Sequence, residues 1–153
     1  MLVLFFIQNE YFKEGEKIMC NSLIMMTTTT ASSVLANGNI PLTTIQRGAG
    51  QTIRGGSNSV IFNRTGYYKV NATVTFTAPS AGNVSIKAQK NGVDIPAMTA
   101  STTITTATTE VRSLAISGIV KVCCCDLPAT LTLVNNGVAI TTSNVEIDVE
   151  YLG

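Results

Sequence analysis

The sequence predicts an all-β domain, an antiparallel sandwich of roughly ten strands. Three observations carry this prediction. Apolar and polar residues alternate strictly along Tyr67–Ala78, which places one side of a strand on a core and the other in solvent. A second alternating run, Asn83–Lys90, ends on the turn dipeptide Asn91-Gly92. The sequence has no segment with the apolar period of about 3.6 residues that an amphipathic helix shows.

Shorter runs with β character surround these two strands and are separated by turn signals. The abundant threonines are β-branched and suit exposed strand faces. Asn37-Gly38, Asn91-Gly92 and Asn136-Gly137 predict tight hairpins, because primed turns need positive φ at both central residues. The further predicted strands are Ser22–Met26, Ser32–Leu35, Ile40–Gln46, Gln51–Arg54, Ser59–Asn63, Val93–Met98, Thr109–Val122, Ala129–Asn135, Val138–Thr141 and Asn144–Leu152.

The segments between these strands are predicted as loops. Gly48-Ala49-Gly50 and Gly55-Gly56-Ser57-Asn58 are rich in glycine, and Pro79-Ser80-Ala81-Gly82 joins the two longest alternating runs. Ala100–Thr109 is almost entirely Thr and Ser, so we expect an exposed loop or a weak edge strand there.

The final predicted strand carries acidic residues at every second position. Glu146, Asp148 and Glu150 alternate with apolar residues and therefore share one face. Paired carboxylates can serve a glycosidase, but a solvated outer face is the favoured interpretation.

Composition and charge exclude several classes of function. Charged residues make up 12% of the chain, and the formal net charge is +1. Without a run of Lys or Arg, the sequence implies neither nucleic acid nor an anionic membrane as a partner. The chain has no His, the commonest general base and neutral metal ligand. Because it also lacks the motifs of a catalytic triad, a phosphate loop or a calcium loop, we expect no enzyme activity, no cofactor and no metal.

Residues 1–18 differ from the rest of the chain, since they contain no Thr and open with the apolar run Leu2–Ile7. That run is too short to span a bilayer, which needs about 20 residues. It also lacks the basic region, the length and the cleavage site of a classical secretory signal. One interpretation is a short strand or helix that packs on the domain, and the other is that residues 1–18 are not normally translated.

The second interpretation rests on the codons that precede Met19. Glu14-Gly15-Glu16 is encoded by triplets that readily contain the bacterial ribosome-binding sequence AGGAG, at a suitable distance from Met19. The natural protein would then start at Met19, in a bacterium or a bacterial virus. Residues 19–26 would form an N-terminal arm and residues 27–153 a single domain, made in the cytoplasm because no classical signal precedes it.

The order of motifs resembles a known superfamily. Gly66-Tyr67-Tyr68 opens a long alternating strand, a short loop follows, and the next strand ends in Lys90-Asn91-Gly92. This arrangement resembles the jelly-roll superfamily of the tumour necrosis factors and the globular heads of complement component one. It is also similar to the C-terminal domains of bacterial collagen-like exosporium glycoproteins and to trimeric heads on phage fibres. The resemblance covers Thr27–Gly153, and its specific motif lies in Gly66–Gly92.

The resemblance implies a jelly roll like that of tumour necrosis factor, assembled as a homotrimer whose apolar sheet faces pack along a three-fold axis. On this basis we expect a structural or interaction protein, the head of a phage or prophage virion, as a fibre head or capsid decoration. The alternative is a lectin-like module on a bacterial or spore surface. Expected partners are further copies of the chain, other virion or surface proteins, or a host-surface glycan. The chain departs from the animal proteins because it lacks Trp and contains three consecutive cysteines.

Two sets of residues are candidates for a site. Cys20 and the run Cys123-Cys124-Cys125 lack the spacing of a zinc site. If the run continues the preceding strand, Cys123 and Cys125 share one face and Cys124 takes the other. Three interpretations stay open. Buried free thiols are favoured, followed by a disulfide from Cys20 to one of the three, and then by a metal or inter-protomer thiol cluster.

The other set consists of three arginines that flank the glycine-rich loops. Arg47, Arg54 and Arg64 could contact an anionic glycan, but the favoured interpretation is that they are surface charges.

Overall fold

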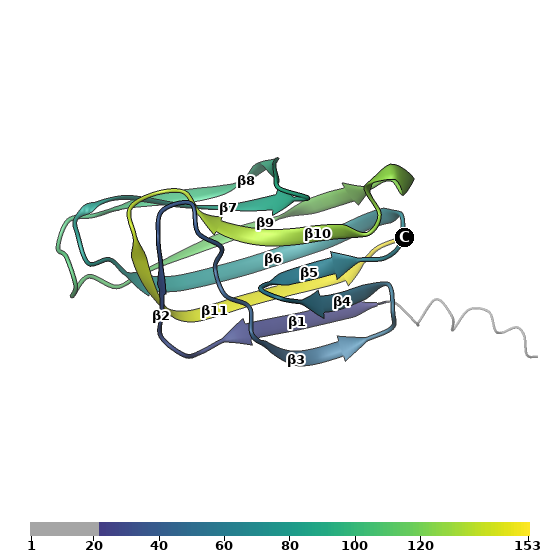
Figure 1. Ribbon diagram of the computed structural model, residues 1–153, viewed down its shortest axis with the longest axis horizontal. Helices are drawn as coiled ribbons and strands as arrows, with labels where there is room; N and C mark the ends of the chain where they lie inside the picture. The colour runs from purple at the N-terminus through teal and green to yellow at the C-terminus, as the bar shows by residue number, and fades with distance from the viewer. Residues whose placement is uncertain (1–21) are drawn as a thin grey trace, which may run out of the picture.

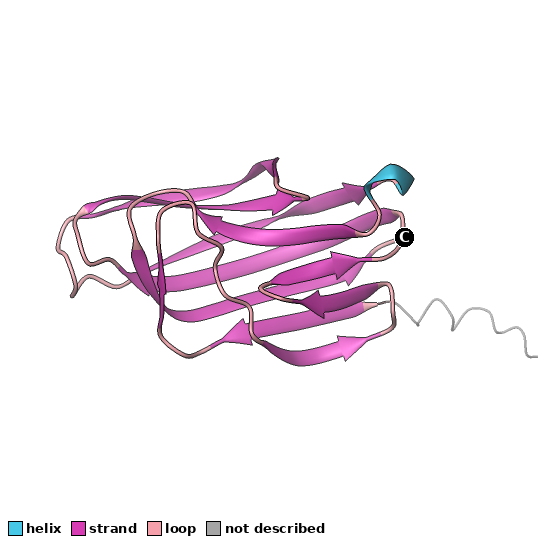
Figure 2. Ribbon diagram, viewed as in Figure 1, coloured by secondary structure: helices cyan, strands magenta, loops and turns pink. Residues whose placement is uncertain are grey.

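The computed structural model describes residues 22–153, which fold as two packed β-sheets (Figure 1), almost without helix (Figure 2). The predictions for residues 1–18, for a start at Met19 and for Cys20 concern residues outside this part. The described elements are β1 (Leu23–Thr28), β2 (Ser32–Val34), β3 (Thr44–Ala49), β4 (Ile53–Gly56), β5 (Ser59–Phe62), β6 (Gly66–Thr77), β7 (Gly82–Lys90), β8 (Val93–Ile104), β9 (Arg112–Val122), the 3-10 turn η1 (Cys124–Asp126), β10 (Ala129–Asn135) and β11 (Ile140–Tyr151).

Both sheets are antiparallel, and the chain passes repeatedly from one to the other. The larger sheet has the order β3-β1-β11-β6-β9, with β2 also paired to β11. The smaller sheet has the order β4-β5-β10-β7-β8. Several strands therefore pair with partners that are distant in sequence, as β1 does with β11. This architecture confirms the predicted all-β jelly-roll sandwich.

The long strand β6 organises the larger sheet, because both of its edges are paired, one with β11 and the other with β9. Its burial alternates as the sequence predicts: Tyr68, Val70 and Ala72 are buried, whereas Lys69 and Asn71 are exposed. The inward side chains enter the core between the sheets, and the outward ones define an exposed surface on the far side of β6.

An aromatic pair joins the two sheets at one end of the core. The rings of Phe62 and Tyr68 are stacked with their centroids 4.2 Å apart, and neither side chain is exposed. The Tyr68 hydroxyl donates a hydrogen bond to the carbonyl oxygen of Arg64 at 2.5 Å. Burial is the main reason why the pKa of Tyr68 is raised to about 12.

The chain between β2 and β4 departs from the prediction. A strand is predicted over Ile40–Gln46, but β3 spans Thr44–Ala49, so the glycine-rich loop predicted at 48–50 begins inside a strand. Ile40 and Leu42 are buried although they lie outside any strand. Pro41, between them, has no N–H to donate to a ladder. The apolar run is therefore explained mainly by packing, and its pairing with β10 is an isolated bridge between Asn39 and Val134 and a hydrogen bond from the Ile40 N–H to the Leu133 carbonyl oxygen.

The C-terminal part also differs. The predicted strands Val138–Thr141 and Asn144–Leu152 are one continuous strand, β11, with a register shift between Thr142 and Asn144. A β-bulge accommodates the extra residue without ending the strand, so the polar residues at this point do not form a turn.

Two other boundaries follow from sheet pairing. Of the predicted loop or edge strand Ala100–Thr109, the first half belongs to β8, an edge strand of the smaller sheet that ends at Ile104. At the N-terminal side, Leu23–Met26 pair with both β11 and β3. The larger sheet therefore includes part of the segment predicted as an arm, residues 19–26.

Candidate functional site

The outward side of the larger sheet is the candidate interaction surface. We call the outward side chains of β1, β11, β6 and β9 the β6 face. Strand register arranges them in cross-strand rows, because directly opposed residues point to the same side. One row contains Leu23, Glu150, Lys69 and Ile119, and the next contains Met25, Asp148, Asn71 and Ser117.

A shallow hollow of about 370 Å³ lies across these two rows. Its wall is part apolar, from Leu23 and Met25, and part charged, from Lys69, Asp148 and Glu150. On the β3 side it is closed by Arg47, which pairs in register with Met25. The hollow thus offers both signs of charge beside apolar surface, a combination suited to a protein side chain or a polar ligand.

The β6 face also exposes large apolar side chains near the end that holds the C-terminus. Ile119 is 56% exposed and Tyr67 is 47% exposed. The Lys121 ammonium lies 5.9 Å from the centre of the Tyr67 ring. Beyond Ile119, a second hollow of about 310 Å³ lies where β9 meets the start of β8, and Val93 and Lys121 help to line it. The apolar surface therefore continues around the β9 edge.

Acidic residues on and off the β6 face differ in their partners. The three acids of the described chain that lie elsewhere each form an ion pair: Asp94 with Lys87, Asp126 with Lys90, and Glu110 with Arg112. Among residues 22–153, no ion pair involves the three acids of the β6 face, which are Glu146, Asp148 and Glu150. The β6 face thus has carboxylates that the described residues do not neutralise by direct contact.

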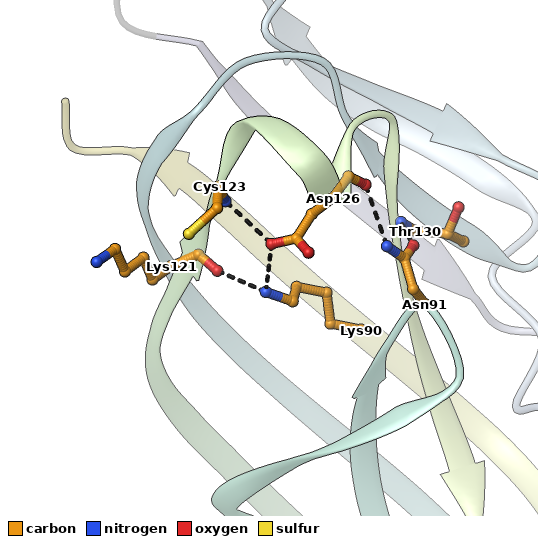
Figure 3. Close-up of polar contacts among 6 residues, drawn as sticks. All are labelled: Lys90, Asn91, Lys121, Cys123, Asp126 and Thr130. Atoms are coloured by element: carbon orange, nitrogen blue, oxygen red, sulfur yellow. Dashed lines mark hydrogen bonds and ion pairs between the residues drawn. The ribbon is translucent and has the colours of Figure 1, made fainter.

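The three consecutive cysteines lie at one end of the sandwich, around η1. The Asp126 side chain holds this loop, because its Oδ2 accepts hydrogen bonds from the Cys123 N–H at 3.0 Å and from Lys90 Nζ at 2.9 Å (Figure 3). Lys90 Nζ also donates to the carbonyl oxygen of Lys121. These contacts lower the pKa of Asp126, with the Cys123 N–H as the largest cause.

Asn91 ties the same loop to the β7–β8 hairpin. Its side-chain nitrogen donates to the Asp126 carbonyl oxygen at 3.1 Å, and its side-chain oxygen accepts from the Thr130 N–H at 2.8 Å (Figure 3). Its own φ is 51° and that of Gly92 is 82°, as the predicted primed turn requires. The Lys90-Asn91-Gly92 motif therefore forms the hairpin and also anchors the cysteine loop.

The cysteines themselves are not buried. Cys123, Cys124 and Cys125 are free and exposed, so the favoured prediction of buried thiols is wrong. The strand ends at Val122 and a 3-10 turn begins at Cys124, which turns the run out of the sheet and away from the core. The alternation of Cys123 and Cys125 against Cys124, predicted for a strand, does not apply to the turn. Pairing with Cys20 stays a prediction, since Cys20 lies outside the described residues.

The three candidate arginines do not form one site. Arg47, on β3, borders the β6 face. Arg54, on β4, is paired in register with Ile61 on the outward side of the smaller sheet. Arg64 lies between β5 and β6 with its guanidinium 5.4 Å from the centre of the Tyr151 ring. Because the sandwich separates them, these residues cannot grip a single anion together.

The loop at the opposite end of β8 and β9 is ordered by one acid. Glu110 Oε1 accepts from the N–H groups of Thr105 at 2.7 Å and Thr106 at 2.9 Å, and Oε2 accepts from Arg112. These contacts lower the pKa of Glu110 to about 2, with the Thr106 N–H as the largest cause. Thr108 adopts a φ of 66° in this loop. The loop thus has a defined shape although most of it is exposed.

Within residues 22–153, no group of three or more Cys, Asp or Glu side chains is arranged to hold a metal ion. The same residues include no helix that is long and apolar enough to cross a membrane.

No protein-family model matches the chain, and no curated protein matches it in sequence. Solved structures match it closely in fold. Murine APRIL superposes with a TM-score of 0.64 at 11% identity, over 86% of this chain and 99% of the APRIL chain. The PRD1 vertex protein P5 gives a TM-score of 0.59 at 13% identity, over 86% and 97%. The globular domain of the zebrafish complement 1qA protein gives 0.58 at 5% identity, over 86% and 96%.

The fold is a tumour-necrosis-factor-like jelly roll. This confirms the resemblance drawn from the Gly66-Tyr67-Tyr68 strand and from Lys90-Asn91-Gly92. At identities this low the likeness concerns the fold, so the function has to be argued from the surfaces of this chain.

Sequence reasoning missed the two acids that order the loops. Each acid has a partner close in sequence. Asp126 accepts a hydrogen bond from the N–H of Cys123, three residues before it, and Glu110 pairs with Arg112, two residues after it. An acid directly after an unusual turn sequence is a weak signal for such a cap. The partner Lys90 could not be found in this way, because it is distant in sequence and comes close only through the fold.

Proposed function

We propose that the protein is a non-enzymatic structural and interaction module that assembles as a homotrimer through the β6 face. We further propose that it serves as the head of a phage or prophage virion, as a fibre head or a capsid decoration, and so lies on the virion exterior. The observation that carries the assembly is the set of acids on the β6 face without an ion pair among the described residues.

The distribution of charge on the β6 face suggests how copies would meet. The acids Asp148 and Glu150 lie on the central strand β11, whereas Lys69 and Lys121 lie on β6 and β9, between β11 and the β9 edge of the sheet. If the β9 side of one copy lies over the β11 side of the next, opposite charges come together. A contact of this kind uses two different patches, and it closes into a ring when the rotation between copies allows.

Apolar side chains would supply the energy of this contact. Tyr67 and Ile119 are exposed on the β9 side, and Leu23 and Met25 lie beside the acids on the β11 side. Interfaces are stabilised mainly by a few well-packed apolar or aromatic anchors, while the charges at the rim set orientation. We expect three copies in each ring, because the Gly66-Tyr67-Tyr68 and Lys90-Asn91-Gly92 motifs resemble those of trimeric jelly rolls.

The proposed place in a virion is supported by the likeness in fold to the PRD1 vertex protein P5. The superposition covers 97% of the P5 chain. The lectin-like alternative is favoured by one observation only, the charged hollow lined by Arg47, Lys69 and Asp148. The placement of Arg47, Arg54 and Arg64 on β3, on β4 and between β5 and β6 weighs against a dedicated anion site.

Light scattering of the full chain, with and without reductant, tests the assembly. We expect three times the chain mass of 16.2 kDa under both conditions. A single-chain mass at every concentration would refute the trimer. In that case, saturable binding on a glycan array would favour the lectin-like alternative, whereas a purely structural module predicts a blank array.

Mass spectrometry of phage particles induced from the source bacterium tests the location. We expect peptides of this chain in particles purified on a density gradient. Their presence only in the cell-envelope fraction would refute the virion proposal.

A further inference from the structure

The three exposed cysteines need an explanation other than packing. Free cysteine is among the most buried residue types in proteins, where it behaves as a small apolar side chain. Cys123, Cys124 and Cys125 are all exposed, so none of them contributes in this way to the core. Exposed thiols are accessible to thiol–disulfide exchange, whereas buried ones are inert.

The loop that carries these thiols is held in place by the rest of the fold. Asp126 accepts from Cys123 N–H and from Lys90, and Asn91 donates to the Asp126 carbonyl oxygen. The short helical turn that carries these thiols lies at one end of the sandwich (Figure 2), and all three thiols are exposed there. A fixed, exposed position lowers the entropic cost of linking a group to an external partner.

Chain geometry restricts which of these thiols can pair within the loop. Consecutive Cα atoms lie about 3.8 Å apart, below the range of about 4.4–6.8 Å that a disulfide usually spans. Neighbours in the run are therefore poor partners, and only Cys123 and Cys125, which are not adjacent, suit a bond inside the loop. Cys124 then has no partner within the loop, and an unpaired exposed cysteine is suited to intermolecular pairing.

We propose that the cysteine loop is a site of intermolecular disulfide formation, in which Cys124 bonds to Cys124 of a second copy of this chain. A second copy presents the same exposed loop, so the contact is symmetric and needs no other protein. Asp126 and Asn91 act as positioning residues, because their hydrogen bonds hold the turn and do not involve the Cys124 sulfur of either copy. The bond can form between single chains or between assembled trimers, so the inference does not depend on the β6 face.

The chemistry requires an oxidant, which is an external low-molecular-weight disulfide. The Cys124 thiolate attacks one sulfur of that disulfide, forming a mixed disulfide and releasing one small thiolate. The Cys124 thiolate of the second copy attacks the protein sulfur of the mixed disulfide, which forms the interchain bond and releases the second small thiolate. In total, two protein thiols are oxidised and one external disulfide is reduced to two thiols.

Non-denaturing incubation of the full chain with oxidised glutathione, followed by non-reducing denaturing electrophoresis and intact-mass measurement, tests the proposal. We expect a covalent species of twice the 16.2 kDa chain mass that dithiothreitol converts back to single chains. The variant Cys124→Ser should lose this species, and Cys20→Ser should retain it. Peptide mapping should find the bond between two Cys124 residues.

Each contrary result overturns the proposal. A wild-type chain that stays at single-chain mass, with or without glutathione adducts, would show that the loop does not link copies. A covalent dimer that persists in Cys124→Ser, or is lost in Cys20→Ser, would place the link elsewhere. Unchanged thermal unfolding of both variants is the control, since an exposed Cys-to-Ser change leaves the packing intact.

Discussion

The two outward faces of the sandwich treat their charges differently. On the smaller sheet, Lys87 Nζ lies 2.9 Å from Asp94 Oδ2, and Gln89 Nε2 donates to Asp94 Oδ1 at 2.8 Å. We call this outward side of β7 and β8 the β7 face. On the β6 face, the acids of β11 form no ion pair with any other described residue, although Lys69 lies on the next strand in register with Glu150.

This difference in charge pairing indicates which face of the sandwich a partner would contact. A charge that is paired within its own face gains little from a partner, because the existing pair would have to be broken or desolvated. A face that combines uncommitted charges with exposed Tyr67 and Ile119 offers both orientation and apolar burial. The β6 face is therefore the surface that we propose for assembly, and the β7 face is proposed to stay in solvent.

The largest effect is expected from two adjacent tyrosines on β6. Tyr68 faces the core and is not exposed, whereas Tyr67 faces out. Tyr68→Ala should lower the free energy of unfolding by about 3–5 kcal/mol, as large-to-small changes of core aromatics do. Tyr67→Ala should change the stability of the isolated chain by only about 0.5 kcal/mol but weaken assembly. Chemical denaturation and light scattering of both variants measure the two effects, and equal losses of stability would contradict the assignment of faces.

The next effect concerns the apolar anchor on β9. Ile119→Glu should weaken assembly by about 2 kcal/mol for each contact, because a charge would replace an exposed apolar side chain within the proposed interface. Analytical ultracentrifugation at several concentrations measures the shift from trimer to single chains. The matched control is Val111→Glu, an exposed apolar residue outside the β6 face, which should leave the trimer unchanged.

Charge reversal should give a smaller and reversible effect. Glu150→Lys places a base where the proposed contact needs an acid, and should weaken assembly by about ten-fold. Adding Lys121→Glu to the same chain restores opposite charges across the contact and should recover part of the loss. Asp94→Lys on the β7 face serves as the control and should not change the mass in solution. Failure of the double variant to recover would argue against the pairing of β9 with β11.

The smallest effect is expected from acid. Glu110, Asp94 and Asp126 have pKa values below their ordinary range, that of Glu110 at about 2. Each contributes stability that is complete above its ordinary pKa and is lost as the pH falls through its folded pKa. The melting temperature should therefore fall between about pH 5 and pH 2, and Glu110→Gln should flatten this fall. The effect is modest because these groups are solvent-screened, and a melting temperature that rises with acid would contradict the account.

The parts of the fold that were predictable from the sequence are those in which the pattern of side chains reports burial directly. Tyr67–Ala78 alternates because one side of β6 enters the core, and Asn91-Gly92 forms its turn because both residues take positive φ. The prediction of a strand at Ile40 and Leu42 was wrong, since both side chains are buried in a segment that is joined to β10 by an isolated bridge and not by a continuous ladder. The bulge in β11 could not be predicted, because an extra polar residue within a strand has the same sequence pattern as a turn between two strands.

The candidate site was less predictable, for a physical reason. Whether Glu146, Asp148 and Glu150 are paired depends on which strands flank β11, and that information lies in the topology and not in the local sequence. The cysteines were misplaced because residue type alone favours burial, while the 3-10 turn after Val122 carries them outward. Lys90 and Asp126 are likewise joined only by the fold.

Lysine labelling tests the central claim, that the β6 face is covered by other copies of the chain. Rates of acetylation, read by mass spectrometry, can be compared between the wild type and Ile119→Glu. The account predicts that Lys69 and Lys121 react more slowly in the wild type than in the variant, while Lys87 on the β7 face reacts equally in both. Equal rates at Lys69 and Lys121 in the two proteins would show that the β6 face is open to solvent, and would contradict the proposed assembly.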